Sequence, residues 1–188
     1  MTRSSPMTFT GHHAPASGFE APFDMLGACH ERVQRMLALL ERLQKHAQTN
    51  GCDAQAKQAA VDVMRYFDLA APLHHQDEEL HFFPLLLHSQ ELALQSAALA
   101  LVEQHRGMEK AWSAMRVVLE ELVLCDTAKP FSALRLEDVQ SFASLYQKHI
   151  DLEEQLVYPA ASDAISDEAL TAASEDMMRR RGVKPLTG

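Results

Sequence analysis

The chain has 188 residues, of which 47% are hydrophobic, and a formal net charge of −9. This length and composition suit one domain with a sizeable core, whereas the acidic balance repels polyphosphate and anionic lipid, so we expect no nucleic-acid partner. No stretch approaches the roughly 20 apolar residues that span a bilayer, so we expect no membrane partner either. The three cysteines form no C-x-x-C pair, and no apolar leader follows Arg3. We therefore expect a cytoplasmic protein with reduced thiols.

Apolar residues recur every three or four positions through four long segments, which predicts helices. The expected helices run from near Phe23 to a break at 49–51, from Asp53 to Leu87 with a kink at Pro72, from a cap at Ser89 to a loop over 125–132, and from that loop to about Val157. Residues 166–181 begin with a capping serine and end in arginines, which predicts a short fifth helix.

No segment shows the period-2 alternation of β-branched residues that a strand requires. The predicted fold class is therefore all-α, an antiparallel up-down four-helix bundle with a short C-terminal extra helix. The expected domains are a disordered N-terminal segment over 1–20, the bundle over 21–161, and the C-terminal helix and tail over 162–188.

A histidine replaces an apolar residue in each of the four helical stripes, and these histidines are regularly spaced. His30 and His74 are 44 residues apart, and so are His105 and His149. The second histidine of each pair begins an H-x-x-x-E-E motif, and each motif is followed by an aromatic residue and a proline. The sequence therefore indicates two similar helix pairs.

Residues four apart lie on one face of a helix, so each motif can direct an imidazole and a carboxylate at one point. The two motifs supply four predicted ligands, and the stripe histidines of the other two helices supply the rest. The six predicted ligands are His30, His74, Glu78, His105, His149 and Glu153. A mixed imidazole and carboxylate set that can bridge two ions is typical of a non-haem dinuclear centre, and two inward carboxylates require cations. We expect two iron ions, with manganese or zinc as alternatives.

The register of the second helix leaves one alternative open. If the helix is rotated by one residue, His75 and Glu79 become the inward pair in place of His74 and Glu78. Asp77 is expected on the solvated face of this helix.

These motifs resemble those of the hemerythrin-like family, the HHE cation-binding domains, over about Phe23 to Ala161. The resemblance rests on residues 26–33, 74–84, 103–106 and 149–159. It implies an antiparallel four-helix bundle with two bridged irons that bind or react with dioxygen, or respond to iron or nitric oxide. It also implies the following ligands: the stripe histidines His30, His74, His105 and His149, the bridging carboxylates Glu78 and Glu153, and His75, because the family often places a further ligand there.

One position departs from the family's pattern. Oxygen-carrying hemerythrins show H-x-x-x-H in the third helix, whereas this chain has His105-x-x-x-Glu109. We interpret Glu109 as a surface residue. The departure favours reaction chemistry or sensing over reversible oxygen carriage.

We therefore expect a non-haem di-iron protein that binds or senses dioxygen, nitric oxide or iron, rather than an enzyme. One alternative is a di-iron carboxylate oxidase or peroxidase-like enzyme, which needs two E-x-x-H pairs, but only Glu78-x-x-His81 has that spacing. The other alternative is a helical interaction module with a structural zinc ion. A homodimer through residues 85–87 and the tail helix is a further hypothesis.

Overall fold

The computed structural model describes residues 21–126 and 129–183, and within these ranges the backbone forms helices and loops without a strand. The predicted all-α fold class is confirmed. The segment 1–20, which was predicted to be disordered, lies outside the described residues. None of the helices in the described part of the chain is both long enough and apolar enough to cross a membrane.

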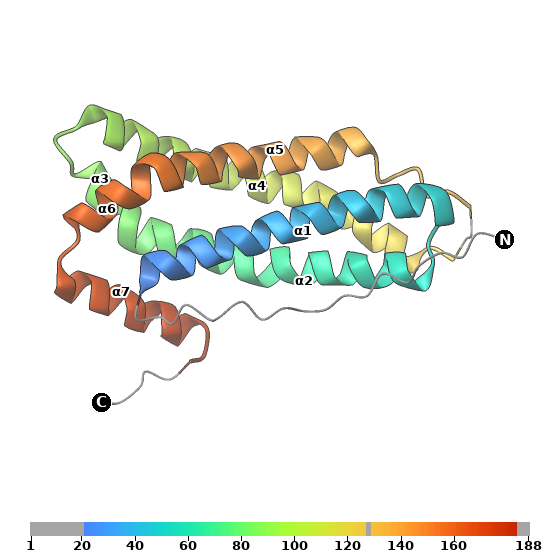
Figure 1. Cartoon of the computed structure of the whole chain (residues 1–188), viewed down its shortest axis with the longest axis horizontal. Helices are drawn as coiled ribbons and strands as arrows, with labels where there is room; N and C mark the ends of the chain where they lie inside the picture. The colour runs from blue at the N-terminus through green and yellow to red at the C-terminus, as the bar shows by residue number, and fades with distance from the viewer. Residues whose placement is uncertain (1–20, 127–128, 184–188) are drawn as a thin grey trace.

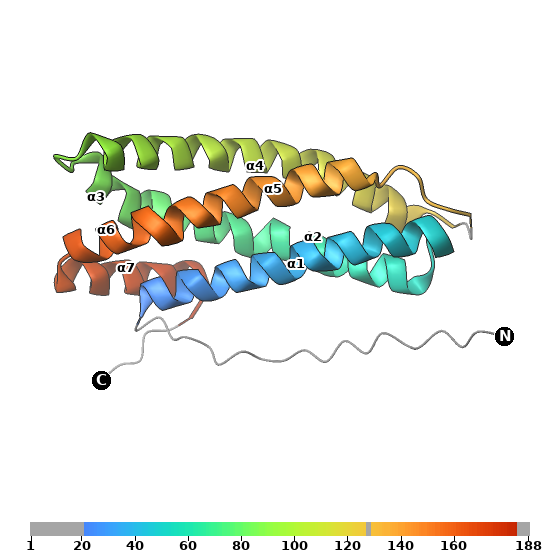
Figure 2. The ribbon, with the colours of Figure 1, turned by 45° about the horizontal axis from the view of Figure 1, so that its top comes forward.

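Four long helices form a bundle (Figures 1 and 2). They are α1 (Pro22–Asn50), α2 (Ala54–Asp77), α4 (Leu92–Leu124) and α5 (Leu136–Leu152). Helix α1 packs against α2 and α5, and α4 packs against the same two helices, so the four enclose a common interior. The apolar stripe of α4 is buried along its length, with His105 in the place of an apolar residue.

The first two helices end and begin where the sequence predicts. Gly51 ends α1 in left-handed backbone, with φ of 73°, and the Asp53 side chain caps α2 by accepting a hydrogen bond from the Ala56 amide at 2.8 Å. The predicted cap at Ser89 is wrong, because α4 begins after Glu91. The Ser89 hydroxyl instead accepts a hydrogen bond from the Glu91 amide at 3.1 Å.

Both H-x-x-x-E-E motifs run into a π-helical turn. The turn η1 (Glu78–Phe82) joins α2 to α3 (Phe83–Leu87), and the turn η2 (Glu153–Val157) joins α5 to α6 (Tyr158–Ala164). In both turns an amide donates to the carbonyl five residues earlier rather than four. The fourth predicted helix therefore continues past Val157. The second predicted helix changes from α-helical to π-helical geometry at Glu78. Pro72, where a kink was predicted, lies inside α2.

The repeated prolines give a physical reason for these turns. Pro84 and Pro159 are each the second residue after a π turn. Proline has no amide proton, and its ring collides with the carbonyl four residues earlier, so the α-helical hydrogen bond cannot form there. The preceding turn widens in both helix pairs, so the backbone shows the same repeat as the sequence.

The predicted fifth helix is α7 (Asp167–Arg180), and its cap is the one expected from the sequence: the Ser166 hydroxyl accepts a hydrogen bond from the Ala169 amide at 3.2 Å. Helix α7 packs against α1 and α2 at the end of the bundle that carries the π turns (Figure 1). Its Ala173 and Met177 side chains are buried.

The expectation that Asp77 is solvated is wrong. Its side chain is fully buried, and its two oxygens pair with Arg180 at 2.6 Å and with Arg181 at 2.5 Å. Both arginines come from α7 or the residue that follows it. Asp77 therefore lies on the outer side of α2 but is buried in an ion pair, because α7 packs over it.

Two apolar clusters fill the bundle. The large apolar cluster is Val33, Leu37, Leu39, Leu40, Leu43, Ala47, Cys52, Ala56, Ala59, Ala60, Val63, Phe67, Ala71, Met108, Trp112, Met115, Leu119, Leu122, Leu134, Val139, Phe142, Tyr146 and Ile150. The small apolar cluster is Met25, Leu26, Phe82, Phe83, Leu86, Leu94, Ala97, Ala98, Leu101, Val157, Tyr158, Ala161, Ala173 and Met177. On α4, Leu101 belongs to the small cluster and Met108 to the large one, and His105 lies between them. The candidate site therefore separates the two clusters.

Candidate metal centre

All seven predicted ligands lie in the bundle interior, and none is more than 6% exposed. They are His30 on α1, His74 and His75 on α2, Glu78 on η1, His105 on α4, His149 on α5 and Glu153 on η2. The structure thus brings together side chains that are up to 123 residues apart in the sequence.

The ligand atoms form three overlapping groups, and within each group the atoms lie within 4.8 Å of one another. One group consists of three imidazoles, from His75, His105 and His149. The second joins His30 and His74 to both carboxylates, and the third joins His105 and His149 to the same carboxylates, Glu78 and Glu153. Because both mixed groups share the carboxylates, the arrangement can hold two cations with carboxylates in common.

The adjacent histidines of α2 face two different neighbouring helices. The His74 ring centroid lies 5.0 Å from that of His30 on α1, whereas the His75 ring stacks on that of His105 on α4 with centroids 3.9 Å apart. Consecutive helical residues point about 100° apart, and α2 lies between α1 and α4. Both side chains therefore enter the site.

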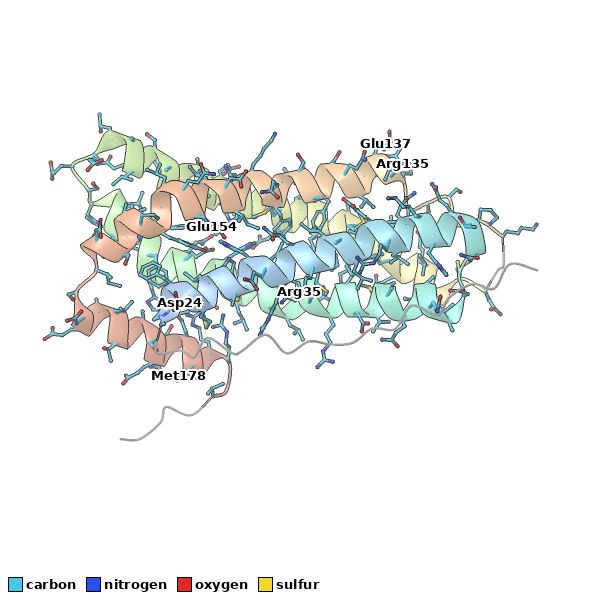
Figure 3. The ribbon with its side chains drawn as sticks, viewed as in Figure 1. Asp24, Arg35, Arg135, Glu137, Glu154 and Met178 are labelled. Atoms are coloured by element: carbon cyan, nitrogen blue, oxygen red, sulfur yellow. The ribbon has the colours of Figure 1, made fainter. Side chains whose placement is uncertain are left out.

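The second glutamate of each H-x-x-x-E-E motif supports a histidine of the other helix pair. Nδ1 of His105 lies 2.7 Å from Glu79 Oε1, and Nδ1 of His30 lies 2.8 Å from Glu154 Oε1. Glu154 lies between α1 and the end of α5 (Figure 3). A carboxylate only accepts hydrogen bonds, so Nδ1 carries the proton, and Nε2 of the neutral ring keeps its lone pair for a metal.

The same orientation holds for His149, whose Nδ1 lies 3.1 Å from Oε1 of Gln104. Its Nε2 faces Nε2 of His105 at 3.1 Å. When both rings are protonated on Nδ1, two nitrogen lone pairs face each other, and a cation would be attracted to both.

The two interior carboxylates lack most of the hydrogen bonds that buried charges require, although Glu78 Oε1 accepts one from Tyr158. Among the described residues, no hydrogen-bond partner reaches Oε2 of Glu78 or either oxygen of Glu153, although both residues are 0% exposed. Nε2 of His149 and Nε2 of His30 approach Glu153 to 2.9 and 3.1 Å, but without hydrogen-bond geometry. An uncompensated buried carboxylate costs on the order of several kcal/mol. The donor set therefore fits bound cations.

The pKa values of the histidines divide them into two kinds. Desolvation by burial lowers the pKa of His74 to about 3 and that of His149 to about 4, so both rings are neutral, as metal ligands must be. Burial also disfavours the charged forms of His30 and His105, but the carboxylates beside them outweigh it and raise both pKa values. Protons therefore compete with a metal ion for these two rings up to a higher pH than at an ordinary histidine.

Two residues that were weighed in the sequence do not reach the site. Glu109 is exposed and belongs to none of the three groups. His81 Nε2 lies 3.0 Å from Asp176 on α7. In the only E-x-x-H pair, Glu78 therefore faces the interior, whereas His81 contacts α7. The carboxylate oxidase hypothesis thus loses the one pair that had its spacing.

The sequence did not predict the supporting roles of Glu79, Glu154, Gln104 and Tyr158. The repeated second glutamate of each motif was the available signal for the first two, and the aromatic residue before the repeated proline was the signal for Tyr158. Nothing in the sequence pattern singled out Gln104.

A helical bundle with five imidazoles and two carboxylates in its interior defines a metal-binding protein of the histidine–carboxylate class. The sequence model of the hemerythrin HHE cation binding domain matches residues 21–161, and the chain belongs to this family. It is also similar to an uncharacterized protein of Haemophilus influenzae (strain ATCC 51907 / DSM 11121 / KW20 / Rd). The two are 33% identical over 163 residues, which cover 87% of this chain and 91% of that protein.

Proposed function

We propose that this chain is a non-haem di-iron protein that binds or senses a small ligand, namely dioxygen, nitric oxide or iron itself. In this proposal residues 21–161 form the antiparallel up-down bundle that carries the site, and residues 162–188 form an appended helix and tail. The observation that carries it is the sharing of Glu78 and Glu153 between two histidine groups, because bridging carboxylates pair two ions in one cavity.

The two proposed metal positions differ in their histidines. His75, His105 and His149 would hold one ion, and His30 and His74 would hold the other. The third imidazole at the first position comes from α2, whereas oxygen-carrying hemerythrins have a second histidine on the third helix. The position with two imidazoles would have fewer protein ligands, which would favour the binding of an exogenous ligand there.

Iron bound in this set would supply one-electron redox chemistry and a coordination position for a diatomic ligand, and manganese or zinc would also suit the donors. The residues of the chain orient the rings through Glu79, Glu154 and Gln104. The two apolar clusters exclude water from both sides of the site.

The homodimer hypothesis used residues 85–87 as part of the interface. Leu87 is 37% exposed and can still contribute to such an interface, whereas Leu86 cannot, because it is buried in the small apolar cluster.

Metal analysis tests the proposal. We would purify the protein without added metal and measure iron, manganese and zinc per chain by plasma emission, with His74→Ala and Glu153→Ala as site variants and Glu109→Ala as the matched surface control. We expect two irons per chain in the wild type and in Glu109→Ala, and fewer in the site variants. A single zinc ion, or two irons retained in His74→Ala, would contradict the proposed ligands.

A further inference from the structure

The two helix pairs correspond at an offset of 75 residues, and the match extends through the site. Positions 30 and 105, 74 and 149, 78 and 153, and 79 and 154 hold identical residues. The first residue after each π turn breaks the match, because it is Phe83 in one half and Tyr158 in the other. The two side chains therefore differ by a hydroxyl group at equivalent places.

The two rings play the same packing role. The Phe83 ring stacks on that of His105, with centroids 5.6 Å apart and an interplanar angle of 25°. The Tyr158 ring stacks on that of His30 at 5.4 Å and 10°. Both rings belong to the small apolar cluster. Packing alone therefore gives no reason for a tyrosine in the second half.

The tyrosine hydroxyl lies among the atoms of one proposed metal position. Tyr158 Oη donates a hydrogen bond to Glu78 Oε1 and lies 3.1 Å from Nε2 of His30. The hydroxyl is the donor in its pair with Glu78, because an ionised carboxylate only accepts hydrogen bonds. At the other position the same space is bordered by Phe83, which has no donor, and a third imidazole is present, from His75.

We propose that Tyr158 determines which small ligands bind at the His30 and His74 position, by donating a hydrogen bond from its hydroxyl to an anionic ligand held there. This inference rests on the proposed di-iron function. Without such a ligand the hydroxyl donates to Glu78, as the structure shows, and with a ligand the proton is redirected to it. The preferred ligand class is a small anion with a hydrogen-bond acceptor at the coordinating atom.

A reciprocal exchange between the two halves tests this role. Tyr158→Phe copies the residue of the other half and keeps the ring, whereas Phe83→Tyr adds a hydroxyl at the equivalent place in the first half. We would load the wild type and both variants with iron, measure metal per chain and thermal unfolding, and titrate azide by visible absorption. In Tyr158→Phe we expect full iron content and an azide affinity about three- to tenfold weaker, because the hydroxyl exchanges its bond to Glu78 for one to azide and only the net value of a hydrogen bond is lost.

The control variant Phe83→Tyr should bind azide as the wild type does. Unchanged azide affinity in Tyr158→Phe would overturn the proposal. Loss of iron in that variant, or loss of a visible charge-transfer band that the wild type shows without azide, would also overturn it, because the oxygen would then be holding the metal itself. Absence of an iron pair in the wild type is a separate result that rejects the proposed function and this inference with it.

Discussion

The two apolar clusters on either side of the candidate site are built differently. The large apolar cluster is drawn almost wholly from the regular stripes of the four long helices and contains no charged side chain. The small apolar cluster is assembled from both π turns, α3, α6, α7 and the ends of α1 and α4. Its Met177 carbonyl accepts a hydrogen bond from Arg181, which pairs with Asp77, and its aromatic rings pack on His30 and His105.

This difference indicates that the large cluster mainly stabilises the fold, whereas the small cluster mainly shapes the candidate metal site. The large cluster gains its stability from apolar burial alone, which needs no ligand. The small cluster shapes a site in which Glu78 Oε2 and both oxygens of Glu153 have no hydrogen-bond partner among the described residues, so these buried carboxylates need the charge of bound cations. Changes in the large cluster should therefore affect folding without altering metal binding, and changes around the site should do the reverse.

The largest effect is expected at the centre of the large cluster. Phe67 is 1% exposed and packs on the rings of Trp112, Phe142 and Tyr146. Phe67→Ala should lower the free energy of unfolding by about 3–5 kcal/mol in urea denaturation. Metal content per chain should stay at the wild-type value. Leu69→Ala, at a position 60% exposed on the same helix, is the matched control and should change stability little. Loss of metal in Phe67→Ala would show that metal binding depends on the packing of the large cluster.

The next largest effect on stability is expected at the contact between the end of α7 and Asp77 on α2. Replacing Arg180 and Arg181 together by alanine leaves the buried Asp77 carboxylate unpaired, which should cost about 3 kcal/mol of unfolding free energy. Arg179→Ala removes a 70% exposed side chain of the same arginine run and should be close to neutral. Equal stability of the double variant and the control would mean that Asp77 does not depend on α7.

A smaller effect is expected where the second glutamates support the ligand histidines. Glu79→Gln and Glu154→Gln keep the size of the side chain but weaken its hold on Nδ1, so each should reduce metal affinity about 10–100-fold in a competition with a chelator. Stability of the metal-free protein should change far less. Glu103→Gln, at a side chain 75% exposed, is the control. Equal affinity in all three variants would exclude a role for the crossed hydrogen bonds.

The last prediction is a dependence of metal affinity on pH. The carboxylates beside His30 and His105 raise the pKa values of both rings, so protons compete with the metal for these rings up to a higher pH than at an ordinary histidine. Affinity should rise with pH through those pKa values and level off above them, with about tenfold per pH unit for each proton below them. Glu79→Gln removes one of the carboxylates that raise the pKa of His105, so its profile should shift to lower pH. A flat profile would contradict these protonation states.

Much of the fold was predictable from the sequence because helical stripes report burial directly. The long helices, the start of α2 near Asp53 and the cap at Ser166 follow from local pattern. The π turns were not predicted, because five residues are too few to show a period, and the repeated prolines were their only signal. The burial of Asp77 was missed because the pattern of α2 carries no information about the later docking of α7.

For the site, the repeat brought out the six residues that the structure gathers in the interior. The place of His75 was left open, because two adjacent histidines can both point inward only when their helix lies between two others, and helix order is not contained in a local motif. The roles of Glu79 and Glu154 depend on contacts across helix pairs, 26 and 124 residues away in sequence, which spacing alone does not predict.

We propose above that two irons share the carboxylates of Glu78 and Glu153. Electron paramagnetic resonance of the iron-loaded, oxidised protein, with the spin count compared to the iron content, tests it most directly. Two bridged ferric ions couple antiferromagnetically, so we predict two irons per chain and almost no ferric signal. A high-spin ferric signal that accounts for all of the bound iron would show isolated ions and contradict the shared site.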